Sequence, residues 1–279
     1  MSLEAGSGWA EPAIISVAPN GARRTKADHP NLPMTTAEVA AAARGAMEAG
    51  AAMIHFHTRD KEGRHLLDAE ASRAGIDAIR AACGDGLIVQ ATTEQAGRYQ
   101  RDVQIAFARA LKPEAITVAP REFAPDAASE AETATLLEWL HRERTMIQYI
   151  LYDANDLARL LDLRKRGLIP GERPSVLYVL GRYSSDGQSK PADILPFLSD
   201  EGLGLVWSVC AFGLREGACA LAAFSLGGHA RVGFENNYHL HDGSLAADNA
   251  ALVAQAAADA RRIGRTVADA AAARELFLG

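Results

Sequence analysis

Short apolar runs alternate with longer alanine-rich stretches along nearly the whole chain. The apolar runs carry few polar positions, as strands of a parallel sheet do when helices cover both faces. The alternation continues without a break, which is typical of consecutive β–α units. The expected strands lie at 13–18, 51–57, 87–91, 115–119, 145–151, 175–180, 204–210 and 228–233.

The stretches between these strands show helical patterns, and residues such as Thr35 and Asp153 are suitable N-caps. Eight β–α units predict a closed (β/α)8 TIM barrel. No linker-like segment divides the chain, so we expect a single barrel domain over 11–279 after a disordered tail at 1–10. The expected helices include 36–49, 69–82, 128–143, 154–166, 215–226 and an alanine-rich one near 246–263, which covers the barrel or a neighbouring subunit.

Composition narrows the class of protein. The 279 residues are 48% hydrophobic and 23% charged, which is enough apolar material for a large core. The net charge of -6 argues against a nucleic-acid partner. Three cysteines without metal-binding spacing indicate a reducing compartment. No signal peptide or membrane span is recognisable, so a cytoplasmic, soluble protein without a membrane partner is expected.

A pair of histidines ends the second expected strand. His55 and His57 are two residues apart and therefore share a face, whereas Phe56 points toward the helices. Spacing alone is equally compatible with a metal half-site and with two structural histidines. Barrel enzymes place their sites at the carboxyl ends of strands, which favours ligation. Glu235 follows the eighth strand, beside strands one and two in a closed barrel, and completes a His₂Glu set typical of catalytic zinc; outside a barrel it is a solvated carboxylate.

Several cations lie near the same rim. Arg231, in the eighth strand, is expected to point into the barrel mouth, where it needs an anionic partner from the protein or from a substrate. The loop after the first strand carries Arg23, Arg24 and Lys26; Arg24 and Lys26 are expected to be solvated, and the role of Arg23 stays open. His229 begins its strand and is expected to be structural.

The third strand ends in hydroxyl side chains. Thr92 and Thr93 are suited to orienting a substrate, although threonine is also a common strand residue. Glu94 either joins this rim or begins a solvated loop. His239 and His241 repeat the two-residue spacing, but their segment ends in Asp-Gly and reads as an exposed turn rather than a second metal site.

The motifs together resemble the β-keto acid cleavage enzyme family. The resemblance runs in order over nearly the whole chain and is looser between about 90 and 195. It rests on Asn20-Gly21-Ala22, Asp28-His29-Pro30-Asn31-Leu32-Pro33-Met34-Thr35, Ile54-His55-Phe56-His57-Thr58-Arg59-Asp60, Trp207-Ser208-Val209-Cys210 and Gly227-Gly228-His229-Ala230-Arg231-Val232-Gly233-Phe234-Glu235-Asn236-Asn237.

The resemblance implies a TIM barrel that forms a homotetramer and binds Zn2+ through His55, His57 and Glu235. It also implies the reaction: a β-keto acid and acetyl-CoA give acetoacetate and a new CoA thioester, while zinc holds the keto and carboxylate oxygens. The ion polarises the carbonyl and stabilises the enolate. Family members pair an arginine matching Arg231 with an acid at the position of Asn236 to manage the proton.

The chain departs from the family pattern in three places. Asn236 replaces the usual acid after the glutamate ligand, and an amide cannot take up a proton. Thr92 matches a serine, and Glu94 and Gln95 replace glycines, so that loop is reshaped. Arg23 stands where members with aminated substrates have a glutamate, which suggests a substrate whose distal end is neutral or anionic.

The sequence therefore predicts a zinc-dependent acyltransferase whose catalytic candidates are Arg231, Thr92 and Asn236. Arg23, Asn20 and Thr93 are the candidate substrate contacts. Two alternatives stay open: a metal-dependent lyase or aldolase that needs no CoA, and a barrel that binds metal and a small acid without turnover. A His₂Glu site also accepts cobalt, nickel, manganese or iron.

Overall fold

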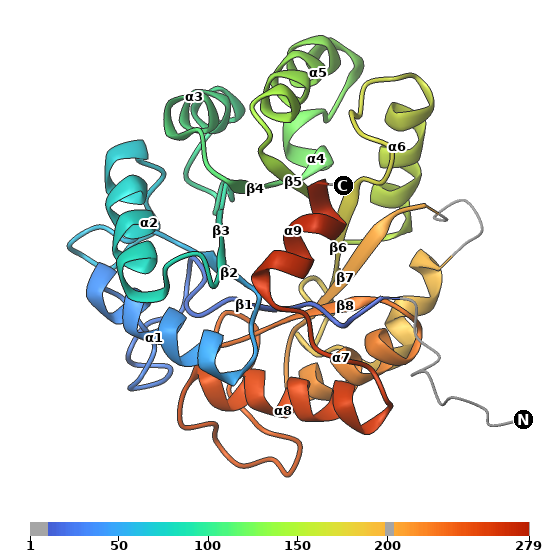
Figure 1. Ribbon diagram of the computed structural model, residues 1–279. Helices are drawn as coiled ribbons and strands as arrows, with labels where there is room; N and C mark the ends of the chain where they lie inside the picture. Colours follow the sequence, from blue (N-terminus) through green and yellow to red (C-terminus); the bar gives the residue numbers. More distant parts are fainter. Residues whose placement is uncertain (1–10, 199–203, 279) are drawn as a thin grey trace, which may run out of the picture.

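A closed barrel of parallel strands forms the centre of the protein (Figure 1). The computed structural model describes residues 11–198 and 204–278, so the expected tail at 1–10 lies outside the described residues. Each strand pairs with its sequence neighbour, and β8 pairs with β1, which confirms the predicted (β/α)8 TIM barrel. The strands are β1 (Ile15–Val17), β2 (Met53–Phe56), β3 (Ile88–Ala91), β4 (Ala115–Val118), β5 (Met146–Leu151), β6 (Ser175–Leu180), β7 (Val206–Ala211) and β8 (His229–Val232).

Helices surround the barrel, and two of them, α3 and α9, were not among the expected helices. The residue that caps α3 is Gln100, which makes no side-chain cap bond, so the usual signal for a helix start is missing there. Among the described helices, none is both long and apolar enough to cross a membrane. The helices are α1 (Thr36–Ala49), α2 (Ala69–Cys83), α3 (Arg101–Leu111), α4 (Pro120–Phe123), α5 (Ala127–Arg142), α6 (Ala154–Lys165), the 3₁₀ helix η1 (Pro191–Phe197), α7 (Glu216–Ser225), α8 (Asn249–Arg262) and α9 (Ala270–Leu278).

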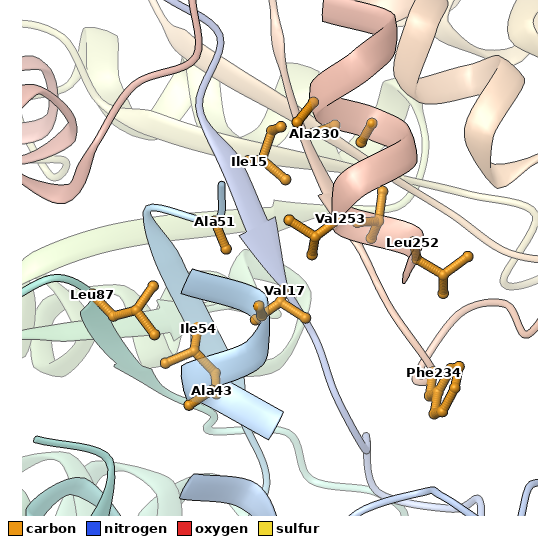
Figure 2. Close-up of a cluster of buried hydrophobic side chains, with 14 of the residues drawn as sticks. Ile15, Val17, Ala43, Ala51, Ile54, Leu87, Ala230, Phe234, Leu252 and Val253 are labelled. Carbon is orange, nitrogen blue, oxygen red and sulfur yellow. The ribbon is translucent and has the colours of Figure 1, made fainter. Parts of the chain in front are cut away.

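The core between the strands and the helices follows from the two-residue period of the strands. Ile15 and Val17 of β1 lie in one apolar cluster with Leu252 and Val253 of α8 (Figure 2). Phe56 of β2 joins the same cluster, as its predicted outward orientation requires. The side chains that alternate with these residues point into the barrel, where polar groups gather toward the carboxyl ends of the strands.

The helix α9 closes the amino-terminal end of the barrel. Ala270 and Ala273 pack against Ile14, Met53 and Met146, which fill that end of the interior. Figure 1 shows α9, in dark red, lying across the middle of the ring of strands. The expected covering helix near 246–263 is α8, which packs on β1 and β8 between α1 and α7 and so covers the wall of the barrel, while α9 covers its end. The candidate site lies at the opposite end.

Candidate active site

Three ligand-type side chains converge at the carboxyl end of the barrel. The Nε2 atoms of His55 and His57 lie 3.1 Å apart. One carboxylate oxygen of Glu235 lies 3.9 Å from the first nitrogen and 3.7 Å from the second. Because β1 pairs with both β2 and β8, barrel closure brings the two histidines and the glutamate together. Within the described ranges, this is the group of His, Cys, Asp and Glu side chains whose geometry suits a metal ion.

The donor atoms of this group fit a divalent cation. His55 Nδ1 lies 2.9 Å from the side-chain oxygen of Gln90, so Nδ1 carries the proton and Nε2 offers its lone pair. Burial, more than any neighbouring charge, holds the pKa of His55 and His57 well below the usual value and keeps both imidazoles neutral. Glu235 Oε2 is buried without a hydrogen-bond partner in the described chain. Two neutral imidazoles and a carboxylate are a typical set for zinc.

The loop after β1 holds these ligands in place. Asn20 donates to the carbonyl of His57 at 2.9 Å and accepts from its backbone N–H at 3.1 Å. Gly21 has a φ of +61°, and a Cβ there would lie 2.6 Å from Cγ of Glu235, so only glycine leaves room for the carboxylate. Arg59 Nε donates to the Gly21 carbonyl at 2.9 Å and ties this loop to β2.

The structure corrects the expected role of Arg24. Its guanidinium donates to the carbonyls of Phe234 at 3.1 Å and Asn236 at 3.2 Å, and it lies 4.3 Å from the ring centre of Tyr238. The prediction of a solvated Arg24 is therefore wrong, because the carbonyls of the turn after β8 need a donor. Lys26, by contrast, is about half exposed, as expected.

Arg231 is buried beside the metal ligands with part of its guanidinium unpartnered. Its Nη2 lies 3.4 Å from Cys210 Sγ and 3.4 Å from a carboxylate oxygen of Glu235. Its Nε and Nη1 are buried and have no hydrogen-bond partner within the described chain. A guanidinium is always charged, and leaving its donors buried and unpaired is costly. These two donors therefore suit an anionic group of a bound substrate.

A cavity opens above these residues, and most candidate contacts line it. Thr93 does not: its hydroxyl donates to the carbonyl of Thr117 at 2.7 Å. Asn236 is also absent from the wall, because it is buried behind Arg231. The Thr92 hydroxyl accepts the backbone N–H of Glu94 at 3.0 Å, and Thr92 lines the cavity. Polar wall residues include Asn20, Arg23, Thr92, Glu94, Arg182 and Arg231.

Glu94 and Arg182 form a charged part of the cavity wall. The sequence left the position of Glu94 open and did not point us to Arg182. A Glu94 oxygen lies 3.7 Å from Arg182 and 3.9 Å from Arg23, and its second oxygen lies 3.9 Å from His57. Burial, followed by the nearby charge of Glu235, raises the pKa of Glu94 to about 7. Glu94 therefore joins the rim rather than a solvated loop. A signal for Arg182 existed, since it lies two residues after the end of β6 at this rim.

A second buried carboxyl, Glu216, lies behind Arg231. It is the first residue of α7, and it accepts hydrogen bonds from the side-chain amides of Asn236 and Asn237, each at 3.3 Å. Burial raises the pKa of Glu216 to about 8, and the two amides oppose that rise. Sequence spacing contains no signal for this contact, because it depends on how α7 packs against β8.

Comparisons with known proteins agree with this geometry. A model of the β-keto acid cleavage enzyme family matches residues 12–278. The chain is 30% identical to the 3-keto-5-aminohexanoate cleavage enzyme of Acetoanaerobium sticklandii, covering 96% of this chain and 98% of that protein. It is 28% identical to the 3-oxoadipate:acetyl-CoA acetyltransferase of Cupriavidus necator, covering 96% and 95%.

Solved structures with similar folds share much less sequence. The complex of ObcA with oxaloacetate superposes with a TM-score of 0.70 at 17% identity, over 89% of this chain and 67% of that one. A type I 3-dehydroquinate dehydratase from Clostridium difficile superposes with a TM-score of 0.58 at 9% identity, over 91% and 93%. At these identities the likeness concerns the barrel fold alone.

Proposed function

The chain belongs to the β-keto acid cleavage enzyme family and is an acyl-transferring enzyme, and we propose that it uses zinc to convert a β-keto acid and acetyl-CoA into acetoacetate and a new acyl-CoA. One observation carries the proposal. The ligand atoms of His55, His57 and Glu235 converge beside Arg231, whose two unpartnered donors provide a place for a substrate anion.

The residues around the ligands have separate tasks in this proposal. A bound zinc ion supplies Lewis-acid polarisation of the keto oxygen. Arg231 binds the substrate anion and stabilises the negative charge that grows when the carbon–carbon bond is made or broken. The Thr92 hydroxyl orients the substrate from the cavity wall. Asn20 lines the same cavity and holds the end of β2 at His57.

The charged wall favours a substrate with a neutral or anionic distal end. Arg23 and Arg182 both line the cavity, with 59% and 25% of their side chains exposed. Glu94 lies between them and offsets part of their charge, so the net charge of this part of the wall is only weakly positive. The Cupriavidus necator relative is named for 3-oxoadipate, a keto-dicarboxylate. A keto-dicarboxylate is therefore our first candidate substrate.

Elemental analysis tests the metal part of the proposal. We expect near-stoichiometric zinc in the purified protein and its loss in the double variant His55→Ala/His57→Ala. The matched control is His239→Ala/His241→Ala, which removes a second histidine pair with the same spacing outside the ligand group. Zinc retained in the first variant, or no metal in the wild type, overturns the assignment.

A panel of β-keto acids with and without acetyl-CoA tests the reaction. We expect acetoacetate and a new acyl-CoA only when both substrates are present. Product formed without acetyl-CoA would instead identify a lyase or aldolase. Zinc and bound β-keto acid without any product would identify a binding protein.

The homotetramer and the cytoplasmic location expected from the sequence stay predictions. Light scattering of the purified protein measures the number of subunits, and a monomeric mass would contradict the first of them.

A further inference from the structure

Glu216 is a buried carboxyl whose partners are neutral N–H groups rather than a cation. Its side chain is 2% exposed. One oxygen accepts the backbone N–H of Gly233 at 3.1 Å and the amide of Asn236 at 3.3 Å, and the other accepts the amide of Asn237 at 3.3 Å. Burying a carboxylate without a countercharge is costly, so its presence here calls for a role beyond packing.

A chain of contacts connects this carboxyl to the cation of the site. Asn236 Oδ1 accepts a hydrogen bond from Cys210 Sγ at 3.2 Å. The same sulfur accepts from Arg231 Nη2 at 3.4 Å, and Arg231 in turn lies 3.4 Å from Glu235. Cys210 and Arg231 face each other in the register of β7 and β8, so the backbone holds this part of the chain in line.

Two acceptors determine which way the amide of Asn236 points, namely the carboxyl of Glu216 at 3.3 Å and the backbone carbonyl of Arg231 at 3.4 Å. A carboxylate only accepts hydrogen bonds, so it selects the rotamer with the NH₂ group toward Glu216 and the oxygen toward Cys210. Asn237 needs no such selection, because it accepts the His239 N–H at 3.0 Å and donates to the His239 carbonyl at 2.6 Å. The backbone acceptor of Asn236 lies at 3.4 Å rather than 2.6 Å, so Asn236 is the amide whose orientation depends more on Glu216.

We propose that Glu216 is a positioning residue for Arg231, acting through Asn236 and Cys210. The acid–amide pair of Glu216 and Asn236 presents an oxygen toward the Arg231 side. Above the pKa of Glu216, the pair also keeps one negative charge behind Arg231. The effect on turnover rests on the proposed acyltransferase function, whereas the pairing itself does not.

An exchange of the acid and the amide tests the proposal. We compare Glu216→Gln, Asn236→Asp and the double variant Glu216→Gln/Asn236→Asp at a pH above the pKa of Glu216. Loss of the orienting carboxylate is expected to lower kcat about tenfold or more in Glu216→Gln, with KM within about threefold, as for other partners that orient a working group. The double variant, with its acid at 236, is expected to recover kcat to within about threefold of wild type.

A matched double variant separates positioning from a purely structural role. Glu216→Gln/Asn237→Asp restores the same charge beside the other amide, which has no contact with Cys210 or Arg231 in the described structure. Its kcat is expected to stay low. Equal recovery in both double variants overturns the proposal, and so does wild-type kcat in Glu216→Gln.

Thermal unfolding gives a second test that does not depend on turnover. It compares wild type, Glu216→Gln, Asn236→Asp and the double variant Glu216→Gln/Asn236→Asp. Asn236→Asp places two carboxyls against each other, so its Tm is expected to fall, and the exchange at both positions is expected to restore it. If the Tm change of the double variant equals the sum of the changes in the two single variants, Glu216 and Asn236 do not act as a pair. If the wild type turns over no β-keto acid, the proposed function fails by itself, and the Tm cycle still decides whether Glu216 and Asn236 act as a pair.

Discussion

Two buried arginines occupy opposite ends of the same barrel and differ in their partners. Arg265, at the amino-terminal end, donates to the carbonyls of Pro12 at 3.1 Å, Phe224 at 3.0 Å and Gly228 at 2.6 Å. Arg231, at the carboxyl end, keeps two buried donors without a partner in the described chain. The first arginine completes the structure, whereas the second has the unpartnered donors that our proposal assigns to a substrate anion.

The buried histidines repeat this contrast. His229 Nδ1 accepts the backbone N–H of Ile14 at 3.1 Å, and its ring lies 6.5 Å from that of Phe277 in α9, which agrees with its expected structural role. His55 and His57 instead direct two ring nitrogens at each other beside a carboxylate. Partners within the chain thus distinguish structural polar groups from those that await a ligand.

The largest expected effect follows from removing a ligand at the carboxyl end. His57→Ala is expected to lower kcat by about 10³-fold or more, because metal polarisation of the substrate contributes several kcal/mol. Kinetics in excess zinc measure the effect, with His239→Ala as the control. Activity within tenfold of wild type would remove His57 from the ligand set.

Exchanging each arginine for methionine tests the contrast directly. Arg231→Met is expected to lower kcat by about 10²-fold with a smaller loss of stability, because it removes donors that serve the substrate. Arg265→Met is expected to keep kcat per folded molecule and to lower the free energy of unfolding by about 3 kcal/mol, since several buried carbonyls lose their donor. Denaturant unfolding and kcat are measured for both. Similar profiles for the two variants would contradict the distinction.

Charge reversal in the wall of the active-site cavity tests which substrates the carboxyl end of the barrel accepts. Arg23→Glu is expected to shift the kcat/KM preference from anionic toward cationic β-keto acids by about tenfold, because a partly exposed charge interacts only moderately with a ligand. Arg182→Glu is expected to shift it further, since its side chain is less exposed. The control is Arg73→Glu, an exposed arginine outside the cavity wall. An unchanged preference in both wall variants would refute the proposed distal specificity.

The smallest effect, taken over a single pH unit, concerns the amino-terminal end of the barrel, which α9 closes. Burial lowers the pKa of His229 from its usual 6.5 to about 3. Between these values the unfolded chain binds the proton and the folded protein does not, so stability falls as the pH falls through this window. His229→Asn keeps an acceptor for Ile14 without titrating, and is expected to reduce that fall by at most about 1.4 kcal/mol per pH unit. Parallel stability curves for variant and wild type would contradict a neutral buried His229.

The local sequence was sufficient to predict which side chains meet at the candidate metal site. The period of two in β2 put His55 and His57 on the inner face and Phe56 on the outer one. Barrel closure then made Glu235 their neighbour, since β8 and β2 flank β1. These features follow from repeating backbone geometry, which a pattern of apolar and polar residues records directly.

Side-chain partners between distant segments needed the tertiary structure. Arg24 was expected in solvent and instead binds the turn after β8, Thr93 turns away from the cavity, and Glu216 reaches Asn236 across the packing of α7 on β8. Each of these contacts joins residues 20 or more apart in the chain. The sequence by itself determined the barrel and which strand ends meet, because hydrophobic period and strand order suffice for both. Only the folded chain decided which buried polar groups satisfy one another and which are left for a ligand, because that depends on how side chains fill the space between elements.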